Sequence, residues 1–181
     1  MAILPITVYG DRILRETSKD IKNIDDATIK LIRDMFETMH NASGVGLAAN
    51  QVGSNKSIFV IDLHTVEGYE KQGPLVVINP EIIAESEELT IYEEGCLSLP
   101  NLRAEVTRPE LIQIKYLDTD EKEQVIEADE FLARVIQHEF DHLIGKMIPD
   151  RVESGVKKKL QSELLRIMKR DVEVGYPVTE K

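Results

Sequence analysis

The sequence has no tryptophan, a single cysteine, and no apolar run approaching the roughly 20 residues needed to cross a membrane. One cysteine, Cys96, cannot form a disulfide bond within the chain. The first residues show no basic segment followed by a long apolar stretch, so they do not indicate a secretion signal. These absences argue against a membrane protein and a disulfide-stabilised secreted protein, and they favour a cytoplasmic one.

What the sequence does contain is typical of a soluble globular domain. Hydrophobic residues make up 42% of the 181 residues and charged residues 30%. The net charge of −11 argues against broad nucleic-acid binding. Positive charge is concentrated between residues 155 and 170, where six basic residues accompany one acidic residue, Glu163. A basic helix there can dock on an anionic surface, although charge alone favours an ordinary solvated face. We therefore expect one domain over residues 1–181, with a basic helix at about 154–170 and a tail at 171–181.

Apolar spacing and turn residues predict an α+β fold. The predicted helices cover about 26–41, 130–144 and 154–170. Buried strands are predicted at 57–62 and 75–79, the second closed by Pro80, and residues 81–92 are expected to be extended. Residues 111–117 and 123–128 predict a hairpin around a polar turn. Residues 63–74 form a polar loop between strands. Short strands joined mainly by hairpins, with separate helices, indicate α+β rather than a doubly wound sheet.

The segment from His138 to His142 reads His-Glu-Phe-Asp-His. On a helix, two histidines four residues apart point to one face, and Glu139 lies beside any metal ion that they bind. The same spacing places Phe131 and Val135 on that face. A histidine on an apolar face is more often a core residue than a ligand, but this pattern reverses the preference and predicts a metal site.

Two imidazoles do not complete a metal site, so a third ligand must come from elsewhere in the chain. A lone cysteine is usually a small buried apolar residue, but opposite a histidine pair Cys96 becomes the better candidate. Glu93 and Glu94 are the rival ligands. A thiolate with two imidazoles suits Zn(II) or Fe(II). A carboxylate in place of the thiolate would make the ligand set harder in the sense of hard and soft donors.

Three segments, residues 44–53, 94–98 and 137–143, together resemble the motifs of the peptide deformylase family: G-x-G-x-A-A-x-Q, E-G-C-x-S and H-E-x-D-H. The resemblance covers about residues 5–170. It implies the family's α+β fold, with antiparallel and mixed strands around a central metal-binding helix and a C-terminal helix. It also implies a bacterial cytoplasmic hydrolase that removes the N-formyl group from the N-terminal methionine of newly synthesised polypeptides and releases formate.

The resemblance further implies Fe(II), with Zn(II), Ni(II) or Co(II) possible, bound by Cys96, His138 and His142. Glu139 is then expected to activate the metal-held water that attacks the formyl carbon. Two hydrogen-bond donors to the formyl oxygen are carried over from the family: the side-chain amide of Gln51 and the backbone N–H of Leu97.

Further residues in or beside the motifs are expected to contact the substrate. They are Gly44, Val45, Gly46, Tyr92, Glu94, Arg103, Phe131 and Val135. Arg134 stands where the family usually has an apolar residue, and we expect its stem to cover the methionine pocket while its charge reaches water.

Two alternatives share part of the pattern. A zincin-type endopeptidase also has H-E-x-x-H, but no histidine follows His142, and only Glu153 and Glu163 are available as a downstream third ligand. A structural metal module would need four protein ligands, and the sequence offers three good ones. The expected partners are N-formylmethionyl nascent chains, with ribosome docking through the basic helix. No membrane partner and no sequence-specific nucleic-acid binding are expected.

Overall fold

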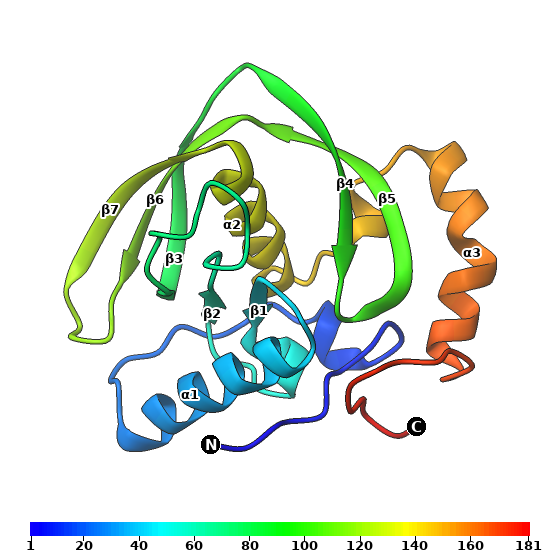
Figure 1. Cartoon of the computed structure of the whole chain (residues 1–181), viewed down its shortest axis with the longest axis horizontal. Helices are drawn as coiled ribbons and strands as arrows, with labels where there is room; N and C mark the ends of the chain where they lie inside the picture. The colour runs from blue at the N-terminus through cyan, green and yellow to red at the C-terminus, as the bar shows by residue number, and fades with distance from the viewer.

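The computed structural model describes residues 1–181, which form two antiparallel sheets and three α-helices (Figure 1). The five-stranded sheet has the order β1 (Gly46–Ala48), β2 (Ile58–Ile61), β3 (Leu75–Glu85), β6 (Leu111–Leu117) and β7 (Glu123–Asp129). The two-stranded sheet consists of β4 (Leu89–Cys96) and β5 (Leu99–Pro109). The helices are α1 (Asp26–Asn41), α2 (Glu130–Leu143) and α3 (Ser154–Met168), with short 3₁₀ turns at Arg12–Arg15, Ala49–Val52 and Ile148–Asp150. The predicted α+β class is confirmed.

The central helix α2 packs on one face of the five-stranded sheet, and their contact forms the largest apolar core. Burial alternates along β6, so Ile112 and Ile114 point inward while their neighbours point out. They pack in the same cluster as Ala133 and Ile136 of α2. This packing fixes which face of α2 turns away from the sheet and toward the β4–β5 hairpin.

The β4–β5 hairpin arches over α2 toward α3 (Figure 1). Its strand β5 alternates between buried and exposed residues, and the buried Leu102 and Val106 belong to one core cluster with Leu164 and Ile167 of α3. The register of the hairpin shifts between Gly95 and Cys96, just before the turn. The end of β4 lies close to the last turn of α2, since Cys96 contacts His142.

Helix α1 begins where the sequence predicted, because the side chain of Asp25 caps it by accepting a hydrogen bond from the backbone N–H of Thr28 at 2.8 Å. Its buried stripe of Ile32, Met35 and Met39 packs against β1 and β2. No helix of the structure is long and apolar enough to cross a membrane.

Three features of the strands differ from the prediction. Strand β3 does not end at Pro80 but continues to Glu85, because a register shift between Ile78 and Glu81 accommodates the proline, which has no N–H to donate. The stretch expected to be extended over 81–92 is interrupted between β3 and β4 at residues 86–88. Strand β5 was not predicted, although its alternation is regular.

Candidate metal centre

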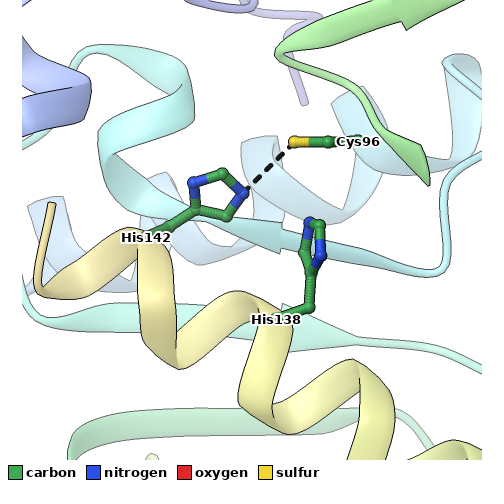
Figure 2. A group of neighbouring side chains, drawn as sticks. All are labelled: Cys96, His138 and His142. Atoms are coloured by element: carbon green, nitrogen blue, oxygen red, sulfur yellow. Dashed lines mark hydrogen bonds between the residues drawn. The ribbon is translucent and has the colours of Figure 1, made fainter. Parts of the chain in front are cut away.

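His138 and His142 project from neighbouring turns of α2 toward the sulfur of Cys96 at the end of β4 (Figure 2). The centroids of the two imidazole rings are 5.0 Å apart, with 75° between their planes. The Sγ atom of Cys96 lies 3.3 Å from Nε2 of His142. One ligand atom from each of the three residues lies within 4.8 Å of the others. The structure thus brings together the three residues that the sequence predicted as ligands.

The rival ligands do not belong to the group of three, and this includes Glu94, although its carboxylate lies 3.0 Å from Nδ1 of His138. Glu93 is exposed on β4. Glu153 is exposed just before α3, and Glu163 is exposed within α3, so none of the three belongs to the cluster around Cys96. No fourth histidine, cysteine or carboxylate joins the group. A set of three protein ligands beside an open cleft is typical of catalytic rather than structural metal sites.

Glu94 orients His138 through a buried network of charges. Its Oε2 atom lies 3.0 Å from Nδ1 of His138, while Arg108 donates to both carboxylate oxygens at 2.6 and 3.0 Å. Arg134 donates to the same carboxylate at 3.0 Å, and Arg108 also reaches Asp141 at 2.8 Å. Burial alone would raise the pKa of Glu94, but the hydrogen bonds from His138 and Arg108 outweigh it and hold the pKa far below the ordinary value. An ionised Glu94 leaves Nε2 of His138 free to face Cys96.

The same charges favour a cation in the centre. Burial opposes protonation of His138, but hydrogen bonds to Cys96 and Glu94 outweigh it and raise the pKa of this imidazole. Burial and the neighbouring His138 lower the pKa of His142, which keeps that ring neutral. Histidine binds metal ions as the neutral imidazole, so a metal ion here would take the place of the proton that the surroundings of His138 favour, while His142 is already neutral.

Glu139 lies in the wall of the cleft next to the candidate ligands. Its side chain is buried, and its Oε2 atom has no hydrogen-bond partner. Burial raises the pKa of Glu139 to about 7. A Cβ atom on Gly46 would lie 2.5 Å from Oε1 of Glu139, so the close approach of β1 to this carboxylate requires glycine. Glu139 is therefore a carboxylate able to hold or release a proton near neutral pH.

Gln51 and Leu97 also reach the centre. The side chain of Gln51 is fixed at both ends: its Oε1 accepts from the N–H of Ala48 at 2.8 Å, and its Nε2 donates to Oγ of Ser98 at 3.0 Å. The same Nε2 lies 3.6 Å from Sγ of Cys96. Leu97 occupies the turn after Cys96, and its carbonyl accepts a 2.7 Å hydrogen bond from the hydroxyl of Tyr176. Tyr176 was not predicted, because nothing in the sequence of the tail connects it to a residue so distant in the chain.

A cleft of about 580 Å³ opens beside the three candidate ligands. Its walls include every residue predicted to contact the substrate: Gly44, Val45, Gly46, Tyr92, Glu94, Arg103, Phe131 and Val135. The ring centroids of Tyr92 and Phe131 are 5.7 Å apart. Arg103 is exposed at the rim of the cleft. Glu94 lines the cleft, but both of its carboxylate oxygens already accept hydrogen bonds from protein groups.

The expectation for Arg134 is wrong for its charge, although its side chain does line the cleft as expected. Its guanidinium does not reach water: the side chain is buried and donates to Glu94, to the carbonyl of Val106 and to Thr90. It also lies over the ring of Tyr92, 5.9 Å from the centroid. The arginine is stable there because the ionised Glu94 and the two backbone carbonyls satisfy its donors.

Comparisons with known proteins agree with this geometry. A family model described as polypeptide deformylase matches residues 3–158. A peptide deformylase of Chlorobium phaeovibrioides is 47% identical over 97% of this chain and 92% of its own length. One of Prosthecochloris aestuarii is 45% identical over 98% and 95%, respectively. The crystal structure of the Ehrlichia chaffeensis peptide deformylase in complex with actinonin superposes with a TM-score of 0.85, at 37% identity, over 96% of this chain and all of that one (100%).

Proposed function

The chain belongs to the polypeptide deformylase family, and from this premise we propose how its own residues remove the N-formyl group from newly made polypeptides. The observation that carries the assignment is the convergence of Cys96, His138 and His142 beside the buried carboxylate of Glu139. Family membership establishes a metal-dependent hydrolase acting on formylated nascent chains. The residue roles, the identity of the metal and the docking partner are the proposals that follow.

One thiolate and two imidazoles fit a divalent transition ion, and Cys96, His138 and His142 would hold it. When bound, such an ion supplies a Lewis acid and a water whose pKa is lowered toward neutrality. We propose Fe(II) as the native ion, with Zn(II), Ni(II) and Co(II) accepted by the same ligands. Glu94 keeps His138 in place through its hydrogen bond to Nδ1, so its role is positioning rather than substrate contact.

Glu139 is proposed as the general base and then the general acid. Its side chain lines the cleft and has a buried oxygen without a hydrogen-bond partner, and a pKa of about 7 lets it take a proton from the attacking water and pass one to the leaving amine. Gln51 and the backbone N–H of Leu97 are proposed as donors to the oxygen of the formyl group as negative charge develops there. Ser98 fixes the amide of Gln51, and the hydroxyl of Tyr176 holds the carbonyl of Leu97.

The walls of the cleft fit an extended peptide with an apolar first side chain. Residues 44–46 and the C-terminal part of β4 both line the cleft, so a substrate backbone can pair with these segments. Val45, Tyr92, Phe131 and Val135 offer apolar surface for the methionine side chain. Arg103 at the rim is proposed to contact the peptide beyond the methionine.

The defining assay compares formate release from formyl-Met-Ala-Ser with internal cleavage of casein. Formate release without casein cleavage is expected. Cleavage of casein with no formate release would support the zincin-type alternative instead.

Replacing Gly46 by Ala is expected to lower kcat by about 10²-fold, because the added methyl group must displace the Glu139 carboxylate or the strand β1. Formate release is the measurement. Gly73→Ala is the matched control, because a Cβ atom there meets nothing within 4 Å. Unchanged turnover in Gly46→Ala would mean that the position of Glu139 is not critical.

We also propose that residues 1–181 act as one catalytic domain in the bacterial cytoplasm and that α3 docks on the ribosome. The inner face of α3, with Leu164 and Ile167, is buried against β5, whereas Lys158 and Lys159 are exposed and form no ion pair. An exposed basic face suits an anionic RNA surface.

The double variant Lys158→Glu, Lys159→Glu is expected to weaken ribosome binding by at least about tenfold at low salt, since like charges then face the RNA. Co-sedimentation with ribosomes measures this, and turnover of formyl-Met-Ala-Ser should not change. Lys22→Glu with Lys71→Glu is the control of equal charge, since both lysines are exposed and far from α3 in sequence. Equal losses in the two double variants would indicate a non-specific charge effect.

A further inference from the structure

The chain has four histidines, and the structure gathers them into two pairs. His138 and His142 form the centre described above. The other two, His40 and His64, lie on either side of Asp62. Nε2 of His40 is 2.9 Å from Oδ2 of Asp62, and Nδ1 of His64 is 2.7 Å from Oδ1 of the same carboxylate. One ligand atom from each of these three residues lies within 4.8 Å of the others.

Asp62 holds a fixed position between the two rings. It follows β2 directly, and its backbone N–H donates to the carbonyl of Val45 at 2.9 Å. Its side chain is only 9% exposed, and its Oδ1 also accepts from the backbone N–H of His64 at 3.2 Å. Burial alone would raise the pKa of Asp62, but the hydrogen bonds from His64 and His40 outweigh it and lower the pKa. The carboxylate is therefore ionised at neutral pH.

Solvent can reach the two rings. The side chains of His40 and His64 are 47% and 55% exposed, and their planes stand nearly perpendicular at 85°, with centroids 5.9 Å apart. The nitrogen that faces Asp62 is Nε2 in one ring and Nδ1 in the other. If each neutral ring carries its proton on the outer nitrogen, both inner nitrogens present lone pairs beside the carboxylate. This change of tautomer needs no net gain or loss of protons.

We propose that His40, Asp62 and His64 form a second site for a divalent transition ion such as Zn(II), separate from the centre at Cys96. Two imidazoles and one carboxylate are a donor set that zinc and its neighbours bind, whereas Mg²⁺ and Ca²⁺ prefer oxygen ligands alone. The set contains no sulfur, so its ion is bound by harder ligands than those of the first centre. An ion here replaces the two hydrogen bonds that now join the rings to Asp62.

The second site joins three segments around one wall of the substrate cleft. His40 lies in the last turn of α1, Asp62 directly follows β2, and His64 is the second residue of the loop over residues 63–74. The C-terminal end of α1 lies beside β1 and β2 in Figure 1. Residues 42–46, which follow α1, line the cleft, and the carbonyl of Val45 is bonded to Asp62. A bound ion thus ties the cleft wall to the loop and stabilises the folded chain, because the unfolded chain does not assemble the three ligands.

The test counts metal ions in the full chain. Protein carrying one equivalent of Zn(II) is dialysed against micromolar free Zn(II), and the bound zinc is measured by elemental analysis. Two ions per chain are expected for the natural sequence. Asp62→Asn, which keeps the shape and one acceptor, is expected to bind one ion. His64→Gln is expected to lower the affinity for the second ion by at least about 100-fold. Loss of a ligand should reduce metal affinity at least as much as loss of a group that orients a ligand.

Three comparisons make the count specific. Cys96→Ser is expected to lose the first ion and keep the second, which would show that the two sites bind their ions independently. Glu67→Gln, an exposed carboxylate in the same loop, is expected to keep both ions. The zinc-dependent rise in the unfolding temperature of Cys96→Ser should disappear when Asp62→Asn is added. One ion per chain in the natural sequence would overturn the proposal, as would a second ion bound equally well by Asp62→Asn.

Discussion

Replacing Glu139 by Gln is expected to lower kcat by about 10²–10⁴-fold while the chain keeps its bound metal. The amide has nearly the volume of the carboxylate, so it fits the tight space against Gly46. What it loses is the ability to take up a proton. Because Glu139 is not among the three candidate ligands, the metal content should not change.

The measurement pairs formate release with elemental analysis of the same preparation. Glu130→Gln, an exposed glutamate in the first turn of α2, is the matched control and should retain full turnover. Loss of the metal together with turnover would make Glu139 a ligand rather than a base. Full turnover in Glu139→Gln would place the base at another residue.

The histidine pair of the metal centre could be predicted because its information is local. The spacing of His138 and His142 fixes their common face once the segment is helical, and the helix follows from its own apolar period and from Gly145 after its end. Gly145 indeed has a positive φ of 71°. The walls of the cleft were predicted through the resemblance, since those residues lie within or close to the three motifs.

The charged network behind the centre could not be predicted in the same way. Arg108 reaches Glu94 across 14 residues and Asp141 across 33, and the tertiary fold alone brings them together. A charged residue in a sequence is most often exposed, so the guanidinium of Arg134 was expected to reach water. It is buried instead. Burial became favourable only because Glu94 offers acceptors to several donors at once.

The path of β3 through Pro80 has a similar explanation. Proline usually ends a strand because it lacks a donor, and the sequence alone does not reveal a bulge that removes the need for one. Tyr176 reaches Leu97 across 79 residues, from a tail without a strong pattern of its own. Contacts of this kind depend on the assembled fold, so local periodicity carries no signal for them.

The buried network leads to the second large effect. Replacing Glu94 by Gln is expected to destabilise the fold by about 3–5 kcal/mol, because it removes the negative charge between two buried guanidinium groups. Arg108 would retain Asp141, which it shares with Arg151, and Arg134 would retain only neutral acceptors. The metal affinity is expected to fall by about 10–100-fold as well, since His138 loses the carboxylate that orients it.

The effect on stability should depend on pH in a defined direction. The pKa of Glu94 in the folded chain lies far below its ordinary value of 4.5. Its stabilisation is therefore complete above pH 4.5 and is lost as the pH falls toward the folded pKa. The difference in unfolding free energy between the natural chain and Glu94→Gln should be constant near neutral pH and should narrow below about pH 4.5.

Urea unfolding in the presence of a chelator separates this charge effect from the contribution of the metal. Glu93→Gln, an exposed neighbour on the same strand, is the matched control and should change stability by no more than about 0.5 kcal/mol. A difference between the natural chain and Glu94→Gln that grew toward acid pH would have the wrong sign for an ionised Glu94. Equal stability of the two chains at neutral pH would mean that water or Asp141 already compensates both guanidinium groups, and the orientation of His138 would then need another source.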